Sequence, residues 1–128
     1  MKENKLFIII DKPIEDVFEF TINPKNTPLW IVHLKEEIAD AYPPKVGTIY
    51  KNRGDSNKWD IYEVTEFKKN STFTMKASDN NYYVRYAYKS IHETRTEMEY
   101  FEWVEKGELE NPFTQITLEK LKEVMEKG

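Results

Sequence analysis

The sequence of 128 residues has no cysteine, four glycines, two histidines and no long apolar run. Without cysteine there are no disulfides, thiol nucleophiles or thiolate metal sites. With so few glycines there is no glycine-rich loop to cradle a phosphate, and no nucleotide-binding, serine-hydrolase or zinc-helix motif occurs. The longest fully apolar run, residues 6–10, is too short for a signal-peptide core or a membrane-spanning helix. We therefore expect a cytoplasmic protein with no integral membrane association.

Charged residues make up 33% of the chain, with 19 basic and 23 acidic side chains interspersed and a net charge of -4. No basic run is present to neutralise phosphates, so nucleic acid is not an expected partner. Hydrophobic residues make up only 39%, but they include eight tyrosines, seven phenylalanines and three tryptophans, which bury a large area each. This length and composition predict that residues 1–128 form a single domain with a substantial core.

The first half of the chain predicts a strand, a helix, a short helical segment and two further strands. Residues 6–10 are short and β-branched, as in a buried strand. Pro13 followed by acidic residues begins a helix, and the apolar positions of residues 14–22 have helical spacing. A second helical turn is predicted to end near Trp30. Strands are then expected over residues 34–42 and 46–53.

The second half alternates between apolar and polar residues with a period of two, which indicates consecutive antiparallel hairpins. Strands are predicted over residues 58–67, 72–77 and 82–91, with a further strand from Thr94 onward. Asn111–Pro112 is then expected to begin an apolar-striped helix of about 15 residues. The expected fold class is α+β: a curved six- to seven-stranded antiparallel sheet wrapped around a long C-terminal helix, with one or two short helices after the first strand.

Four segments carry a resemblance to a known family. They are residues 13–20 (PIEDVFEF), residues 23–30 ending in tryptophan, residues 62–67 (YEVTEF) and residues 94–98 (TRTEM). In this order they cover essentially the whole chain. The chain resembles the START-like superfamily, also called SRPBCC, helix-grip or polyketide cyclase/dehydrase-like proteins. The resemblance implies the helix-grip fold. It leaves the activity open, because the family contains binders, transporters, cyclases and chaperone activators.

The aromatic face of the predicted sheet and the resemblance together predict a cavity between the sheet and the C-terminal helix that binds a small apolar molecule, lipid-like or polyketide-like. The alternative for each of these rings is that it simply fills the core, as aromatic residues on an alternating strand usually do. Periodicity does not determine which face of its strand Trp59 occupies. The expected ligand-binding residues are Trp30, His33, Trp59, Phe73, Met75, Tyr86, Tyr88, Met98, Tyr100, Leu118 and Leu121.

The charged candidates give weaker signals. Glu63 and Glu102 are expected on the surface, because glutamate is almost never buried without a partner. His33 either lines the pocket entrance or is an exposed loop histidine, and His92 falls in a predicted turn. Two scattered histidines without spaced carboxylates do not predict a metal site, and no cofactor is expected.

Three functions follow as alternatives. The first is binding of the small apolar ligand. The second is a cyclase- or dehydratase-type enzyme, which would need His33 or a glutamate beside a tyrosine hydroxyl in the pocket. The third is a stress-related interaction domain similar to chaperone activators, which would present an exposed apolar patch. Catalytic residues are not identified by the sequence, and a homodimer is left open.

Overall fold

A computed structural model describes residues 1–127, and Gly128, the last residue of the predicted domain, lies outside the described residues. Seven strands and three helices form within this range. In chain order they are β1 (Glu3–Ile10), α1 (Ile14–Ile22), α2 (Thr27–Trp30), β2 (Glu36–Ala39), β3 (Ile49–Arg53), β4 (Asp60–Lys68), β5 (Thr72–Ala77), β6 (Tyr82–His92), β7 (Arg95–Val104) and α3 (Gln115–Lys127).

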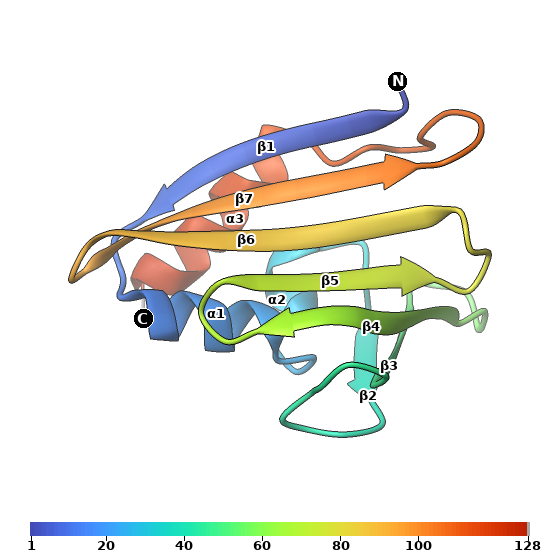
Figure 1. Ribbon diagram of the computed structural model, residues 1–128, viewed down its shortest axis with the longest axis horizontal. Coiled ribbons are helices and arrows are strands. Elements are labelled where there is room, and N and C mark those ends of the chain that lie inside the picture. Colours follow the sequence, from blue (N-terminus) through green and yellow to red (C-terminus); the bar gives the residue numbers. More distant parts are fainter. Residues whose placement is uncertain (128) are drawn as a thin grey trace.

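All seven strands belong to one curved antiparallel sheet in the order β1-β7-β6-β5-β4-β3-β2. The three helices lie on one side of this sheet, which we call the inner face (Figure 1). The chain order explains the topology, because consecutive hairpins from β2 to β7 pair with their neighbours and β1 closes onto β7. The predicted α+β helix-grip architecture is confirmed.

The alternation predicted for β6 is also present in the structure. Tyr86 pairs with Tyr100 and Tyr88 pairs with Met98 across the β6–β7 ladder. All four side chains are buried on the inner face, whereas Lys89 on the other face of β6 is exposed. A period of two in a strand therefore identified the side of the sheet that the helices cover.

The core fills most of the space between the helices and the sheet. Trp30, Met98, Leu118 and Leu121 are each fully buried. Phe18 of α1 makes an edge-on contact with Tyr88, with ring centroids 5.1 Å apart. Burial of such large side chains is the main favourable contribution to folding.

The C-terminal helix differs from its prediction at the start. It begins at Gln115, three residues after the expected Asn111–Pro112 start. Asn111 instead adopts a left-handed conformation with φ of 52°, which asparagine tolerates better than most residues. The backbone of Phe113 is then held to the sheet by hydrogen bonds to the Glu102 and Asn4 side chains. The helix is therefore 13 residues long rather than about 15.

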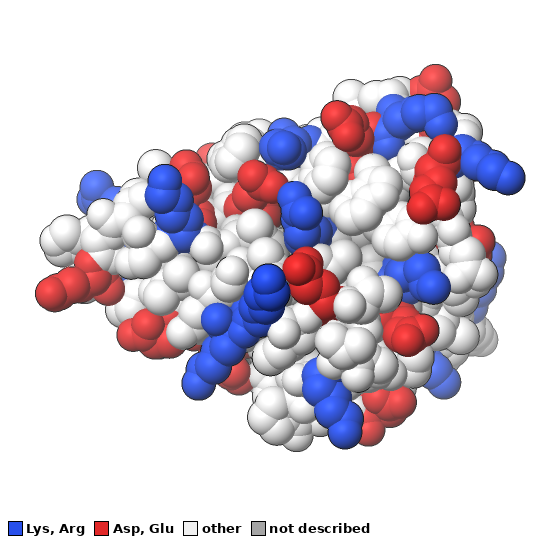
Figure 2. Space-filling model, viewed as in Figure 1, with Lys and Arg blue, Asp and Glu red and all other residues white. Residues whose placement is uncertain are grey.

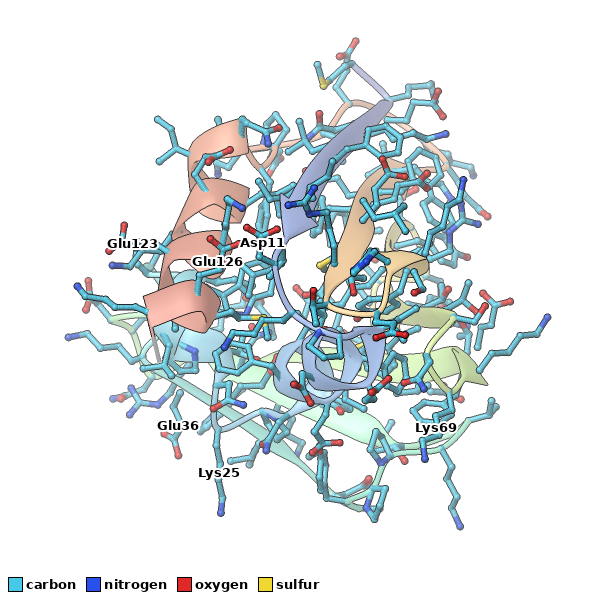
Figure 3. The ribbon with its side chains drawn as sticks, turned by 90° about the vertical axis from the view of Figure 1, so that its left-hand side faces the viewer. Asp11, Lys25, Glu36, Lys69, Glu123 and Glu126 are labelled. Carbon is cyan, nitrogen blue, oxygen red and sulfur yellow. The ribbon has the colours of Figure 1, made fainter. Side chains whose placement is uncertain are left out.

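Helix α3 covers the exposed edge of the sheet as well as the inner face. Gln115 Nε2 and Lys122 Nζ donate hydrogen bonds to the β1 carbonyls of Phe7 and Ile9, each at 2.8 Å. Near the end of the helix Glu126 accepts the backbone N–H of Asp11 at 2.7 Å. Figure 3 shows α3 beside the β1 edge, with Asp11 and Glu126 facing each other. These contacts satisfy edge-strand carbonyls that would otherwise be free to pair with another chain.

The other sheet edge is shorter than predicted. The strand expected over residues 34–42 is limited to Glu36–Ala39, and the strand expected over residues 46–53 is limited to Ile49–Arg53. Pro43 and Pro44 cannot donate to a ladder. Gly47 has a positive φ of 96° in the turn that follows, and the regular strand begins only at Ile49.

The outer face of the sheet carries charges of both signs. Figure 2 shows Lys and Arg side chains interspersed with Asp and Glu across this view, with no broad patch of either sign. Trp103 lies on this face and stacks on Tyr83, with ring centroids 5.0 Å apart. None of the helices within residues 1–127 has the length and hydrophobicity that spanning a bilayer requires.

Candidate functional site

Two adjoining spaces open at the end of the sheet where β3, β4 and β6 approach the connection between β7 and α3. The inner chamber has a volume of about 150 Å³ and is lined by Ile31, His33, Leu34, Glu37, Asn52, Gly54, Asp60, Tyr62, Met75, Tyr82, Val84, Tyr86, Tyr100 and Phe113. The mouth groove has a volume of about 860 Å³ and is lined mainly by residues 58–62, 77–82 and 108–117, with His33 and Val104. Five residues line both spaces, so the chamber opens into the groove.

Five tyrosine and phenylalanine rings line the inner chamber, together with aliphatic and polar side chains. Tyr100 stacks face to face on Phe113, with centroids 4.4 Å apart and planes 4° from parallel. Tyr86 lies 5.8 Å from Tyr100, and Tyr62 meets Tyr82 edge-on at 6.4 Å. Such ring pairs stabilise each other, so they form a packed wall on one side of the chamber.

Glu102 is buried behind this wall, and the prediction that it lies on the surface was wrong. Its side chain is only 2% exposed. One carboxyl oxygen accepts hydrogen bonds from the Tyr82 and Tyr100 hydroxyls at 2.6 and 3.3 Å. The other accepts from Asn4 Nδ2 at 2.9 Å and from the Phe113 backbone N–H at 2.7 Å. A buried glutamate is tolerated because it has donors on both oxygens.

These bonds give Glu102 a positioning role. It lines neither space, but it fixes two chamber tyrosines and holds Phe113 against Tyr100. Asn4 Nδ2 also donates to the Phe113 carbonyl at 2.9 Å, so strand β1 contributes to the same support. Residues from three distant parts of the chain therefore set the shape of the chamber.

Two chamber hydroxyls have no protein partner. Neither Tyr62 nor Tyr86 donates or accepts a side-chain hydrogen bond within the described part of the chain, although Tyr86 is only 5% exposed. Burial raises the pKa of Tyr62 to about 12 and raises the pKa of Tyr86 well above its ordinary value. Both hydroxyls are therefore protonated at neutral pH and can donate to a ligand.

Glu37 supplies the acidic group of the chamber. Its carboxyl oxygens accept hydrogen bonds from the Thr27 hydroxyl at 2.5 Å and from Asn52 Nδ2 at 3.1 Å. Burial nevertheless raises its pKa, because desolvation outweighs these two bonds. Sequence reasoning did not identify Glu37. A signal was available, since Glu36 and Glu37 are consecutive in a strand and point to opposite faces.

Replacing Glu37 with glutamine should stabilise the fold at neutral pH. The raised pKa means that ionisation of Glu37 disfavours the folded state. The free energy of unfolding is therefore higher at low pH, where Glu37 is protonated, and it falls as the pH rises through the pKa of Glu37 in the folded protein. Glutamine keeps an acceptor for Thr27 or Asn52 without the charge. We expect the melting temperature at pH 8 to rise by about 2 to 5 °C. At pH 4 or below the gain should vanish, and a gain independent of pH would contradict this account of Glu37.

The eleven residues predicted for the ligand site fall into two groups. Met75, Tyr86 and Tyr100 line the inner chamber, His33 is exposed and lines both spaces, and Trp59 lines the mouth groove. The other six are buried in the core and line neither space: Trp30, Phe73, Tyr88, Met98, Leu118 and Leu121.

The helices account for this division. The Tyr88 hydroxyl is hydrogen-bonded to Thr21 of α1 at 2.6 Å, and Trp30 of α2 packs against Tyr86 at 6.0 Å. The side chains of α3 that face the sheet are themselves buried, and α3 contributes only Thr117 to the lining of the two spaces. The accessible volume therefore lies beside the helices, toward the loops at the end of the sheet.

Comparison with protein-family models gave no match. Comparison with curated proteins also gave no match.

Many solved structures match the fold. They include the Aha1 dimer from Colwellia psychrerythraea, with 13% identity, a TM-score of 0.70, and coverage of 98% of this chain and 97% of that chain. Protein MLL2253 from Mesorhizobium loti has 13% identity, a TM-score of 0.73, and coverage of 97% and 98%. The di-domain ARO/CYC BexL from the BE-7585A biosynthetic pathway has 10% identity, a TM-score of 0.66, and coverage of 81% of this chain and 36% of that chain.

Identities this low establish the architecture and leave the activity open. The likenesses extend over most of this chain, and they agree with the seven-stranded curved sheet and the C-terminal helix described above. The chain therefore has the START-like, polyketide cyclase-like helix-grip fold.

Proposed function

We propose that this protein binds a small, largely apolar molecule, with one end of the ligand in the inner chamber and the remainder in the mouth groove. The observation that carries the proposal is the pair of tyrosine hydroxyls without a protein partner, in a chamber that aromatic and aliphatic side chains line together with Glu37, Asn52 and Asp60. Small-molecule sites are typically concave and apolar with a few polar groups that orient the ligand. Tyr62 and Tyr86 are suited to that orienting role.

The dimensions limit what the chamber can accept. A cavity of roughly 150 Å³ can hold one benzene-sized ring. The adjoining groove is several times larger, at about 860 Å³, so a longer ligand could extend toward Trp59 and His33. The geometry supports a ligand with a compact cyclic end better than a bulky polycyclic body held wholly beneath α3.

Binding can be tested with 2-phenylethanol, a neutral molecule of suitable size. We expect titration of ¹⁵N-labelled protein to shift the backbone amide resonances of Gly54, Val84 and Phe113. Val84→Phe should fill the chamber and weaken binding by about tenfold or more, an effect of roughly 1.4 kcal/mol. Native mass spectrometry of the purified protein would show any ligand retained from the cell.

Tyrosine variants on β6 provide a matched control. Tyr86→Phe removes a free hydroxyl from the chamber, whereas Tyr88→Phe removes a hydroxyl that is bonded to Thr21 outside it. Binding of 2-phenylethanol should weaken in the first variant and stay unchanged in the second. Shifts confined to the outer face of the sheet, or equal binding by wild type and Val84→Phe, would overturn the proposal.

A second candidate function is acid–base catalysis on a polyketide-like substrate. It is favoured by one observation: Glu37, with its raised pKa, lines the same chamber as the Tyr86 hydroxyl. A carboxyl group whose pKa is moved toward neutrality can transfer protons to and from a bound substrate. Mass spectrometry of a polyketide-like probe after incubation would distinguish this from binding alone, because only catalysis would yield a dehydrated or cyclised product.

A further inference from the structure

The lining of the two spaces is strongly biased in charge. The inner chamber contains two acidic side chains, Glu37 and Asp60, and no lysine or arginine. The mouth groove adds Asp79, Glu108 and Glu110 against a single lysine, Lys58. The chain as a whole carries nearly balanced charge, with 19 basic and 23 acidic residues. The excess of carboxylates around the site is therefore local.

Most of these carboxylates have no cationic partner in the described structure. Glu108 pairs with the N-terminal ammonium of Met1 and is neutralised. Glu37, Asp60, Asp79 and Glu110 form no salt bridge within residues 1–127. Four uncompensated carboxylates around one opening create a negative potential that favours a positive ligand.

Arginine near the groove does not offset this charge. Arg53 lies over the Trp59 ring at 5.6 Å, but its guanidinium is paired with Glu36 at 3.0 Å. Arg53 lines neither space. Lys58 is therefore the one fixed cation that lines the opening among the described residues.

The aromatic wall favours the same kind of ligand. A cation is attracted to the negative faces of tyrosine and phenylalanine rings, and this attraction grows when the cation is desolvated. The chamber combines such rings with the carboxyl group of Glu37 and with the unpartnered hydroxyl of Tyr86. The Tyr86 residue is only 5% exposed. Aromatic rings, an acceptor and a free hydroxyl together make a suitable site for a protonated amine.

We propose that the ligand carries a cationic amine, whose ammonium group lies among the tyrosine rings of the chamber, Glu37 and Asp60, and that the site discriminates against carboxylates such as fatty acids. This inference rests on the proposed binding function and narrows its ligand class. An anionic head would have to approach four uncompensated carboxylates, whereas an ammonium would form charge-assisted hydrogen bonds with Glu37 or Asp60.

Three probes that share a phenyl ring test the inference: 2-phenylethylamine, 2-phenylethanol and 3-phenylpropionate. Their affinities for the whole protein can be measured at pH 7.5 by ¹⁵N chemical-shift titration. We expect the amine to bind at least about tenfold more tightly than the carboxylate, with the alcohol between them. That ratio corresponds to roughly 1.4 kcal/mol.

Variants that remove one carboxylate charge show which residues give the preference for the amine. Glu37→Gln and Asp60→Asn should each reduce the preference for the amine over the alcohol about threefold or more. Glu63→Gln is the matched control, because Glu63 is an exposed residue of β4 that lines neither space, and its preference should equal that of wild type.

The outcomes separate the two proposals. If the alcohol binds in the chamber and the carboxylate binds as tightly as the amine, the cationic ligand is ruled out and the binding function stands. If Glu63→Gln loses as much preference as Glu37→Gln, the discrimination arises from net charge rather than from the site, and the inference also fails. If none of the three probes binds, the binding function is overturned and this inference with it.

Discussion

Glu102→Leu is expected to lower the free energy of unfolding by about 3 kcal/mol or more, one of the two largest effects of a single substitution that we anticipate. Leucine has similar volume but no acceptor, so four donors that now bond to the carboxyl group would lose their partner. Each buried donor without a partner costs about 1 to 3 kcal/mol. The Phe113 N–H has no rotational freedom with which to find another acceptor. Urea unfolding followed by tryptophan fluorescence measures the loss.

Two control variants distinguish the loss of the Glu102 hydrogen bonds from the change in side-chain shape. Glu102→Gln keeps one oxygen for Asn4 and Phe113, and its amide can donate to the tyrosine hydroxyls, so the loss should be about 1 kcal/mol. Glu99→Leu changes a glutamate on the opposite face of the same strand, where it lies 3.5 Å from Arg85, and should cost less than about 1 kcal/mol. Equal losses in Glu102→Leu and Glu99→Leu would show that the buried hydrogen bonds do not stabilise the fold.

The strands of the second half of the chain were predictable because their signals are local. Alternation in residues 82–88 fixes the face of β6, and Asp79-Asn80-Asn81 supplies a turn with Asn80 at a φ of 58°. The predicted bounds of β5, residues 72–77, match the structure. The short β2 and β3 were overestimated because Tyr42 and Val46 are suited to a strand but lie in the loop with Pro43, Pro44 and Gly47.

For Glu102, the alternation along β7 indicates the inner face, but the burial statistics of glutamate led to the wrong prediction of a surface position. It has the same parity as Met98 and Tyr100, which were both assigned to the inner face. Glutamate is so seldom buried that the surface was the expected position. Two of the partners that allow its burial, Asn4 and Phe113, lie outside β7, 98 and 11 residues away in the sequence. Nothing local to β7 indicates them.

The position of the open volume depends on how side chains pack, and periodicity carries no information about that. The sequence places Leu118 and Leu121 against the sheet, and both are fully buried there. The gap between helix and sheet stays open only if the side chains of Trp30, Phe18 and Tyr88 do not occupy it. In this chain they fill it, and the accessible chamber is displaced toward Glu37, Asn52 and Gly54.

Leu118→Ala should therefore behave as a core substitution and lower the free energy of unfolding by about 3 kcal/mol, within the range of 2 to 5 kcal/mol seen for buried leucine. Leu118 is fully buried, so the variant loses transfer free energy and leaves a cavity under α3. Ile116→Ala is the control on the same helix, because Ile116 is 78% exposed, and it should change stability by less than about 0.5 kcal/mol.

Ligand binding provides the second readout for Leu118→Ala. Leu118 lines neither the chamber nor the groove, so the fraction of the variant that is folded should bind 2-phenylethanol with wild-type affinity and show the same amide shifts. Urea unfolding and the ¹⁵N titration test the two expectations on one sample. A loss of binding together with less than about 1 kcal/mol of destabilisation would place the ligand beneath α3, because only a side chain that contacts ligand more than core would give that combination.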